Sequence, residues 1–137
     1  MAAIKYNNPG NIRIGENWLG SITPGASSSF VEFKTLAYGI RAIFVILNTK
    51  IGKGQNTIEK IITTYAPPTE NDTETYIQNV SQWTGIPRTA TIFSDNYPDL
   101  KKIVKAIVRQ EQGVILTDSE IEEGFNLWQN IKKKGLT

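Results

Sequence analysis

Apolar residues recur at helical spacing through most of the chain after Ala37. The clearest stripe lies between Pro98 and Gly113 and consists of Leu100, Ile103, Val104, Ile107 and Val108. Steps of three and four residues predict an amphipathic helix with one face in a core. Gly113 is placed to end this helix in the left-handed conformation.

Four further helices are predicted by the same spacing. They begin at Ala37, at Asn56, at Asp72 and at Thr117 or Asp118. Asn56 with Glu59, and Thr117 with Glu120, have the spacing of a capping box, in which each side chain bonds the other's backbone N–H. The chain therefore carries a mostly helical pattern from residue 37 onward.

The N-terminal part carries turn and strand signals instead. Residues 6–13 are dense in turn formers and should lead into a short strand, and Phe30–Phe33 has strand character. A Ser, Gly and Pro-rich loop from Ser21 to Ser29 lies between them. These signals predict one α+β domain over residues 1–137, with a small antiparallel β element near its N-terminus.

Composition narrows the chemistry that the chain can perform. It has 137 residues and contains neither cysteine nor histidine. Disulfides, thiol nucleophiles, Ser-His-Asp triads and histidine-ligated zinc are therefore excluded, and acid–base catalysis falls to Asp or Glu. The carboxylate spacings match no known metal cage, so we expect neither a metal nor another cofactor.

Charge and hydropathy argue against two classes of partner. The net charge of +2 is too small to indicate nucleic-acid binding, although Lys132–Lys134 form a local basic run. The apolar runs are shorter than a membrane span requires. The N-terminus also lacks the charged head and apolar centre of a signal peptide.

Glu111 is the most conspicuous candidate for acid catalysis. One further step along the stripe of the 98–113 helix reaches this residue, in the last helical turn. Partial burial and the negative end of the helix dipole should both raise the pKa of its carboxyl group. A carboxylic acid that stays protonated near neutral pH suits a glycosidase. The alternative is that the helix end frays and Glu111 turns into solvent beside Arg109.

Arg41 has two interpretations of its own. It follows Ile40 directly and lies off the centre of the apolar stripe in its helix. It could be an ordinary surface charge or the partner of a buried carboxylate. The pattern favours the surface position.

Several motifs together resemble a family of phage and prophage proteins whose members are labelled virion structural protein or lysozyme-like protein. The motifs are Asn7–Arg13, Trp18 with Gly20, Phe30 with Phe33, Tyr38–Ala42, and Tyr65–Thr73 with Tyr76. The resemblance implies a lysozyme-like fold that acts on bacterial cell-wall glycan. The run Arg109–Gly113 is similar to the helix end that carries the catalytic Glu of lysozymes and lytic transglycosylases. Because it follows the β element here, the order resembles a circular permutation.

The resemblance also suggests residues for the remaining roles. Glu32, or Glu16, could supply a second acid, although Glu32 fits a solvent-facing strand position better. Lytic transglycosylases work with one Glu, assisted by the substrate's N-acetyl group. Side chains that could stack on sugars or bond their polar groups are Asn8, Asn11, Arg13, Trp18, Tyr65 and Tyr76. Each has a structural alternative, such as holding a turn or covering the core.

Two hypotheses of function follow. The first is a peptidoglycan glycosidase, either muramidase or lytic transglycosylase, that cleaves the β-1,4 bond next to N-acetylmuramic acid with Glu111 as general acid. The alternative is a non-catalytic phage virion or cell-wall-binding protein that keeps a lysozyme-like fold. The missing second acid and the missing signal peptide fit the alternative. In either case we expect peptidoglycan and other virion proteins as partners, and a location in the virion or in the host cytoplasm before release.

Overall fold

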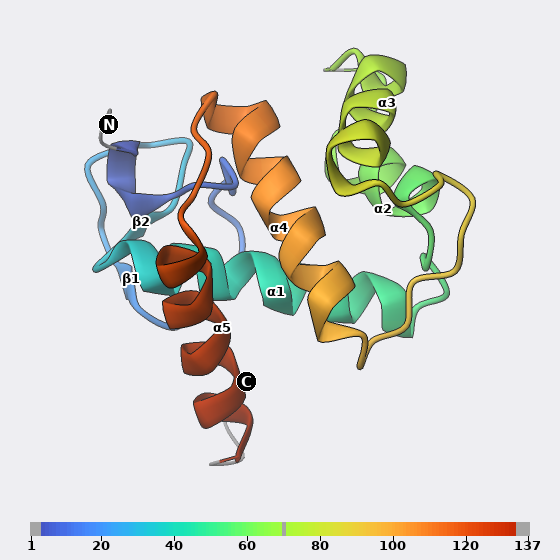
Figure 1. Ribbon diagram of the computed structural model, residues 1–137. Coiled ribbons are helices and arrows are strands. Elements are labelled where there is room, and N and C mark those ends of the chain that lie inside the picture. The colour runs from blue at the N-terminus through green and yellow to red at the C-terminus, as the bar shows by residue number, and fades with distance from the viewer. Residues whose placement is uncertain (1–3, 70, 134–137) are drawn as a thin grey trace.

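The computed structural model describes residues 4–69 and 71–133. Within these ranges the elements follow in this order: η1 (Lys5–Asn7), β1 (Ser21–Ile22), β2 (Glu32–Phe33), α1 (Leu36–Gly52), α2 (Ile58–Tyr65), α3 (Thr73–Thr84), α4 (Tyr97–Gln112) and α5 (Asp118–Lys133) (Figure 1). The predicted α+β class, mostly helical with a small antiparallel sheet, is confirmed. None of the helices in the described ranges is long and apolar enough to cross a membrane.

Helix α1 runs through the middle of the molecule and organises the packing. In Figure 1, α4 crosses it, α5 lies against one part of it, and α2 and α3 stand together at the other side. Gly124 lets α5 approach closely, since a Cβ at that position would overlap the side chain of Ile40. A glycine inside a helix costs about 1 kcal/mol relative to alanine. That cost is offset by the close contact between the two helices.

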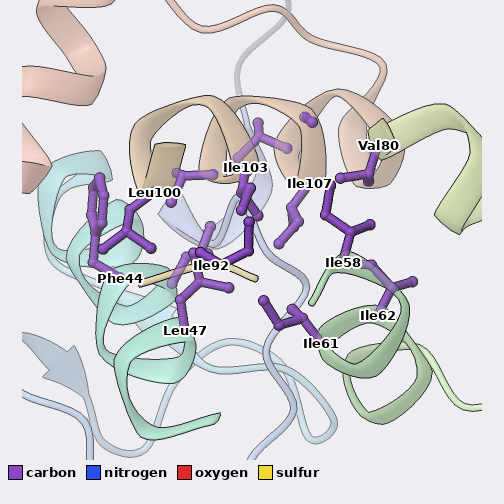
Figure 2. Close-up of a cluster of buried hydrophobic side chains, with 14 of the residues drawn as sticks. Phe44, Leu47, Ile58, Ile61, Ile62, Val80, Ile92, Leu100, Ile103 and Ile107 are labelled. Carbon is purple, nitrogen blue, oxygen red and sulfur yellow. The ribbon is translucent and has the colours of Figure 1, made fainter. Parts of the chain in front are cut away.

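The core lies where α1, α2, α3 and α4 meet. Figure 2 shows side chains from these helices pointing toward one another, with Phe44 and Leu47 from α1 and Ile103 and Ile107 from α4. The whole predicted stripe of α4 is buried, with Leu100, Ile103, Val104, Ile107 and Val108 all at 0% exposure. Burying one such side chain stabilises the fold by about 1.5–3 kcal/mol. The amphipathic pattern of the sequence therefore corresponds to the actual core.

Helix ends follow the capping rules, with one correction. Thr117 and Glu120 exchange hydrogen bonds as a capping box at the start of α5, with N···O distances of 2.9 and 3.1 Å. The cap of α2 is Thr57 rather than the predicted Asn56, because the Thr57 hydroxyl accepts from the N–H of Lys60 at 3.2 Å. Both residues can cap a helix, so the sequence alone could not separate them.

The β element differs from its prediction. Ser21–Ile22, placed in the predicted loop, pairs with Glu32–Phe33 in the register Ser21↔Phe33 and Ile22↔Glu32. The strand expected after residue 13 is reduced to one isolated bridge between Arg13 and Phe30. Two backbone hydrogen bonds flank this bridge, from Val31 to Ile12 and from Ile14 to Ser29. Asparagine side chains add to this pairing, since the Asn7 amide donates to the Phe33 carbonyl at 3.1 Å. Side-chain bonds of this kind compete with a sheet for the backbone.

Candidate active-site cleft

Glu111 lies in the last turn of α4, and its carboxylate is held from two directions. Oε1 accepts a hydrogen bond from Nδ2 of Asn11 at 2.8 Å, and Oε2 accepts one from the hydroxyl of Tyr76 at 2.9 Å. Gly113 ends the helix with φ of 66°, so the turn that carries Glu111 is a capped one. The Arg109 guanidinium lies elsewhere, over the Trp83 ring at 4.1 Å from its centroid. The carboxylate is thus fixed between the N-terminal segment and α3.

Two tyrosines lie beside Glu111, of which Tyr76 is buried and Tyr65 is half-buried. Tyr76 is 3% exposed, and the hydroxyl of Tyr65 donates to the Gly10 carbonyl at 2.6 Å. Burial raises the pKa of both hydroxyls far above the ordinary tyrosine value, and the charge of Glu111 raises both further. Both tyrosines therefore remain protonated and act as hydrogen-bond donors.

The N-terminal segment is fastened to the end of α4 by amide side chains. Asn11, at a positive φ of 51°, accepts from Nε2 of Gln112 at 3.1 Å while it donates to Glu111. The same Nε2 lies 3.2 and 3.3 Å from the carbonyl oxygens of Asn8 and Pro9. Asparagine tolerates the left-handed conformation better than most residues. Glu111 and Gln112 together set the position of this segment.

A cleft of about 500 Å³ opens in front of Glu111. It lies between the N-terminal segment, α1, α2 and the residues after α2, and its lining includes Asn11, Arg13, Phe30, Lys50, Tyr65, Pro67, Asn71 and Glu111. Among the lining residues that the structure describes, Glu111 is the only carboxylate, and the cations are Arg13 and Lys50. The volume is in the range of small-ligand sites.

Four of the predicted site residues meet in this cleft, and one supports it. Asn11, Arg13, Tyr65 and Glu111 all line it. Tyr76 contacts Glu111 from behind.

Asn8 and Trp18 lie apart from the cleft. Asn8 is 2% exposed, and its amide donates to the carbonyls of Ile12 and Val31 at 2.9 and 2.8 Å while it accepts from the Ile12 N–H at 2.9 Å. It therefore holds the turn, which was its structural alternative. Trp18 packs on a small cluster that includes Ile12 and Phe33, and it lines a neighbouring cavity.

The structure does not bring Glu32 to Glu111. Strand alternation holds locally, because Val31 and Phe33 are buried and Glu32 is only partly so. Its Oε1 accepts from the Ala26 N–H at 2.8 Å, and the side chain lines a separate cavity of about 400 Å³ at the hairpin. Glu16 lines the cavity beside Trp18. In the described part of the chain, no cluster of three Asp, Glu, His or Cys side chains could hold a metal ion.

Sequence reasoning missed the roles of Gln112 and Arg41. Gln112 follows Glu111 directly, and that adjacency was the only available signal for its contact with the loop. Arg41 is 1% exposed, so the expected surface position is wrong. The reason is that α1 is buried nearly all round here, since every residue from Gly39 to Phe44 is buried. A prediction from an apolar stripe assumes that the opposite face of the helix is exposed to solvent, and this part of α1 has no exposed face.

Comparison with known proteins adds a relationship to the geometry. No model of a protein family matches the chain. Over 128 residues, however, the chain is 40% identical to "Protein P5" of Pseudoalteromonas phage PM2, and the match covers 89% of this chain and 78% of that protein. Identity at this level over most of both chains establishes common ancestry. The chain therefore belongs to the same family as the bacteriophage protein P5 of PM2.

Proposed function

We propose that this chain is a virion component of a bacteriophage and that it acts on the glycan strands of bacterial peptidoglycan in the Glu111 cleft. Its membership in the family of a phage protein supports the phage part of this proposal. The resemblance of its motifs to lysozyme-like phage proteins supports the choice of substrate. The cleavage step rests on one observation, which is a partly buried glutamate at a helix end that faces a cleft of about 500 Å³.

In this proposal Glu111 is the general acid. It protonates the glycosidic oxygen of the β-1,4 bond next to N-acetylmuramic acid while positive charge develops at the anomeric carbon. Each carboxylate oxygen accepts one protein hydrogen bond, from Asn11 or from Tyr76. Each oxygen also has a second lone pair, so one of the two oxygens can carry the proton that is transferred to the glycosidic oxygen. The two bonds hold the acid in one position, which is the requirement for efficient proton transfer.

The absence of a second carboxylate among the described lining residues favours a one-acid scheme. Hydrolases of the two-acid type place a second carboxylate across the scissile bond. In the one-acid scheme the substrate's N-acetyl oxygen bonds to the anomeric carbon as the glycosidic bond breaks. Glu111, now deprotonated, then removes the proton of the C6 hydroxyl of N-acetylmuramic acid, whose oxygen attacks the anomeric carbon and displaces the N-acetyl oxygen. That route yields 1,6-anhydro ends, as in lytic transglycosylases.

A second candidate is a virion or cell-wall-binding protein without catalysis. It is favoured by the same two hydrogen bonds, because they would also serve to join the N-terminal segment to α3. The position of Glu32 at the hairpin loop fits this candidate too. In that case Glu111 is a structural anchor and the cleft only binds glycan.

Digestion of purified peptidoglycan separates the two candidates. We compare the wild type with Glu111→Gln and with Glu123→Gln, an exposed residue on α5 that serves as the matched control. Cleavage predicts soluble muropeptides from the wild type and the control, and a rate lower by roughly 10²–10⁴-fold for Glu111→Gln. Mass spectrometry then distinguishes anhydro from reducing ends. Thermal melts of all three proteins confirm that they are folded.

The non-catalytic candidate predicts a different pair of results. None of the three proteins would release fragments under conditions in which a reference muramidase does. Wild-type protein would nevertheless sediment with insoluble peptidoglycan. Sedimentation without release would overturn the assignment of Glu111 as an acid, and the absence of both would overturn the whole proposal.

A further inference from the structure

Arg41 is a buried cation without a hydrogen-bond or ion-pair partner in the part of the chain that the structure describes. It lies on α1 and is 1% exposed, which makes it the largest of the fully buried side chains. Its Nε has no hydrogen-bond partner in the described part of the chain. The ion pairs found there involve Arg88, Lys101 and Lys105 instead.

Such an arrangement is destabilising for the protein alone. Burying an unpaired ion costs several kcal/mol, even after the surroundings relax. Burial lowers the pKa of the Arg41 guanidinium, with a smaller opposing effect from Tyr38. Arginine nevertheless remains charged in proteins. Natural proteins break a packing rule in this way chiefly where function requires it.

The cavity that Arg41 lines is electropositive. It has a volume of about 570 Å³, and its cations are Arg13, Arg41, Lys50 and Lys53, against the single carboxylate of Glu16 among its described lining residues. Burial lowers the pKa of Lys50, and the charge of Lys53 adds to the effect. An anion in this cavity would stabilise all of these charges.

This cavity adjoins the Glu111 cleft. The residues that line both are Ile12, Arg13, Ile46, Lys50 and Thr64. A ligand that extends from the cleft past these shared residues would therefore enter the cavity that Arg41 lines.

The geometry points to a carboxylate-binding subsite at Arg41, which receives an acidic group attached to the glycan in the Glu111 cleft. This inference rests on the proposed function. Peptidoglycan offers carboxylates from two sources, the peptide stem of N-acetylmuramic acid and, where that stem has been removed, the lactyl group to which it was joined. The planar guanidinium suits either, because its N–H groups match the two oxygens of a carboxylate. Trp18, which also lines this cavity, would cover the apolar part of the ligand.

Titration of wild-type protein with small ligands tests the inference directly. The ligands are N-acetylglucosaminyl-N-acetylmuramic acid, its tetrapeptide derivative, the same derivative with all carboxylates amidated, and a chito-oligosaccharide without carboxylates. N-acetylmuramic acid is the reducing sugar in the first three ligands and is missing from the fourth, so none of them contains a β-1,4 bond from its anomeric carbon, the bond whose cleavage gives 1,6-anhydro ends. The NMR signal of the Trp18 indole N–H reports on the cavity, and the signals of Trp83 and Trp128 serve as internal references.

We expect the acidic ligands to bind about tenfold more tightly than the amidated one, since a hydrogen bond to a charged group contributes about 1.5 kcal/mol. Preference for the peptide-free disaccharide would identify the lactyl carboxylate, and preference for the tetrapeptide would identify the stem. Equal affinity for acidic and amidated ligands would overturn the subsite. That comparison needs no variant protein.

Arg41→Met provides the second arm, because methionine keeps much of the apolar volume and removes the charge. We expect a melting temperature equal to or above that of the wild type, together with loss of the tenfold preference and unchanged chito-oligosaccharide affinity. Arg41→Lys should keep part of the preference. A large fall in stability for Arg41→Met would show that Arg41 is structural.

The two proposals fail in distinguishable ways. If no ligand binds, the glycan proposal fails and the subsite fails with it. If the chito-oligosaccharide binds but amidation has no effect, only the subsite is wrong.

Discussion

Glu111 and Arg41 are charged side chains at adjoining cavities, and the protein treats them in opposite ways. Both oxygens of Glu111 accept hydrogen bonds from Asn11 and Tyr76. The Nε of Arg41 has no partner among the described residues, although Arg41 is the more buried of the two. The satisfied group is fixed in place, whereas the unsatisfied one keeps its bonding capacity for a ligand. A fixed position and an unused bonding capacity thus belong to different residues, in two adjoining cavities.

The wall that the two cavities share depends on the N-terminal segment. Ile12 and Arg13 line both cavities, and Asn8 holds them through its three hydrogen bonds to Ile12 and Val31. Gly39 lets the N-terminal segment lie close against α1, because a Cβ at position 39 would overlap the Asn7 carbonyl. A change in this segment should therefore disturb both cavities at once.

The largest effect on stability is expected for Asn8→Ala. It would remove the Asn8 bonds to the Ile12 N–H and the Val31 carbonyl, whereas the Ile12 carbonyl would keep its bond from the Val31 N–H. Each buried group left unsatisfied costs about 1–3 kcal/mol. We expect a loss of about 3 kcal/mol in the free energy of unfolding, measured by urea denaturation. Asn17→Ala, at an exposed position, should change it by less than about 0.5 kcal/mol. Equal stability of the two variants would contradict this role of Asn8.

The contrast between this segment and the helices also shows what the sequence could predict. The apolar stripe of α4 and its Gly113 stop were predictable, because helical periodicity and caps are local properties. The presence of a small antiparallel β element was also predicted, but its pairing was not, because side chains of Asn7 and Asn8 bond backbone far along the chain. No periodic pattern encodes such bonds.

In the candidate site, too, local features could be predicted from the sequence and long-range contacts could not. Glu111 could be singled out because the stripe of its own helix reaches it. Its partners, Asn11 and Tyr76, are 100 and 35 residues away in the sequence. Their contact with Glu111 depends on how α3, α4 and the N-terminal segment pack together. Arg41 was misplaced because burial from several sides is a property of the assembled fold.

An intermediate effect is expected for the bond between Tyr76 and Glu111. A double-mutant cycle with Tyr76→Phe and Glu111→Gln should give a coupling of about 1.5 kcal/mol in the free energy of unfolding, because the bond has a charged acceptor. The matched cycle uses Tyr65→Phe, whose hydroxyl donates to the Gly10 carbonyl instead. Its coupling with Glu111→Gln should stay below about 0.5 kcal/mol. Equal coupling in both cycles would mean that Glu111 is not held by Tyr76 in particular.

The smallest effect is expected at Arg88, an arginine that, unlike Arg41, has carboxylate partners. Its guanidinium bonds Glu59 and Glu74 near the surface, and the hydrogen bond from Arg88 is the main cause that lowers the pKa of Glu74 to about 2. A carboxyl group whose pKa is lowered on folding stabilises the folded state at pH values above its ordinary pKa of 4.5. That contribution is lost as the pH falls toward 2. Because these groups are exposed, salt should weaken the effect.

Arg88→Gln should therefore lower the melting temperature slightly at pH 7 and flatten its decline between pH 4.5 and pH 2, so that variant and wild type converge at the acid end. Arg109→Gln is the control, since the Arg109 guanidinium lies over the Trp83 ring. Melting curves across this pH range, at low and high salt, measure the difference. If Arg88→Gln and the wild type decline in parallel, the exposed pair contributes nothing measurable.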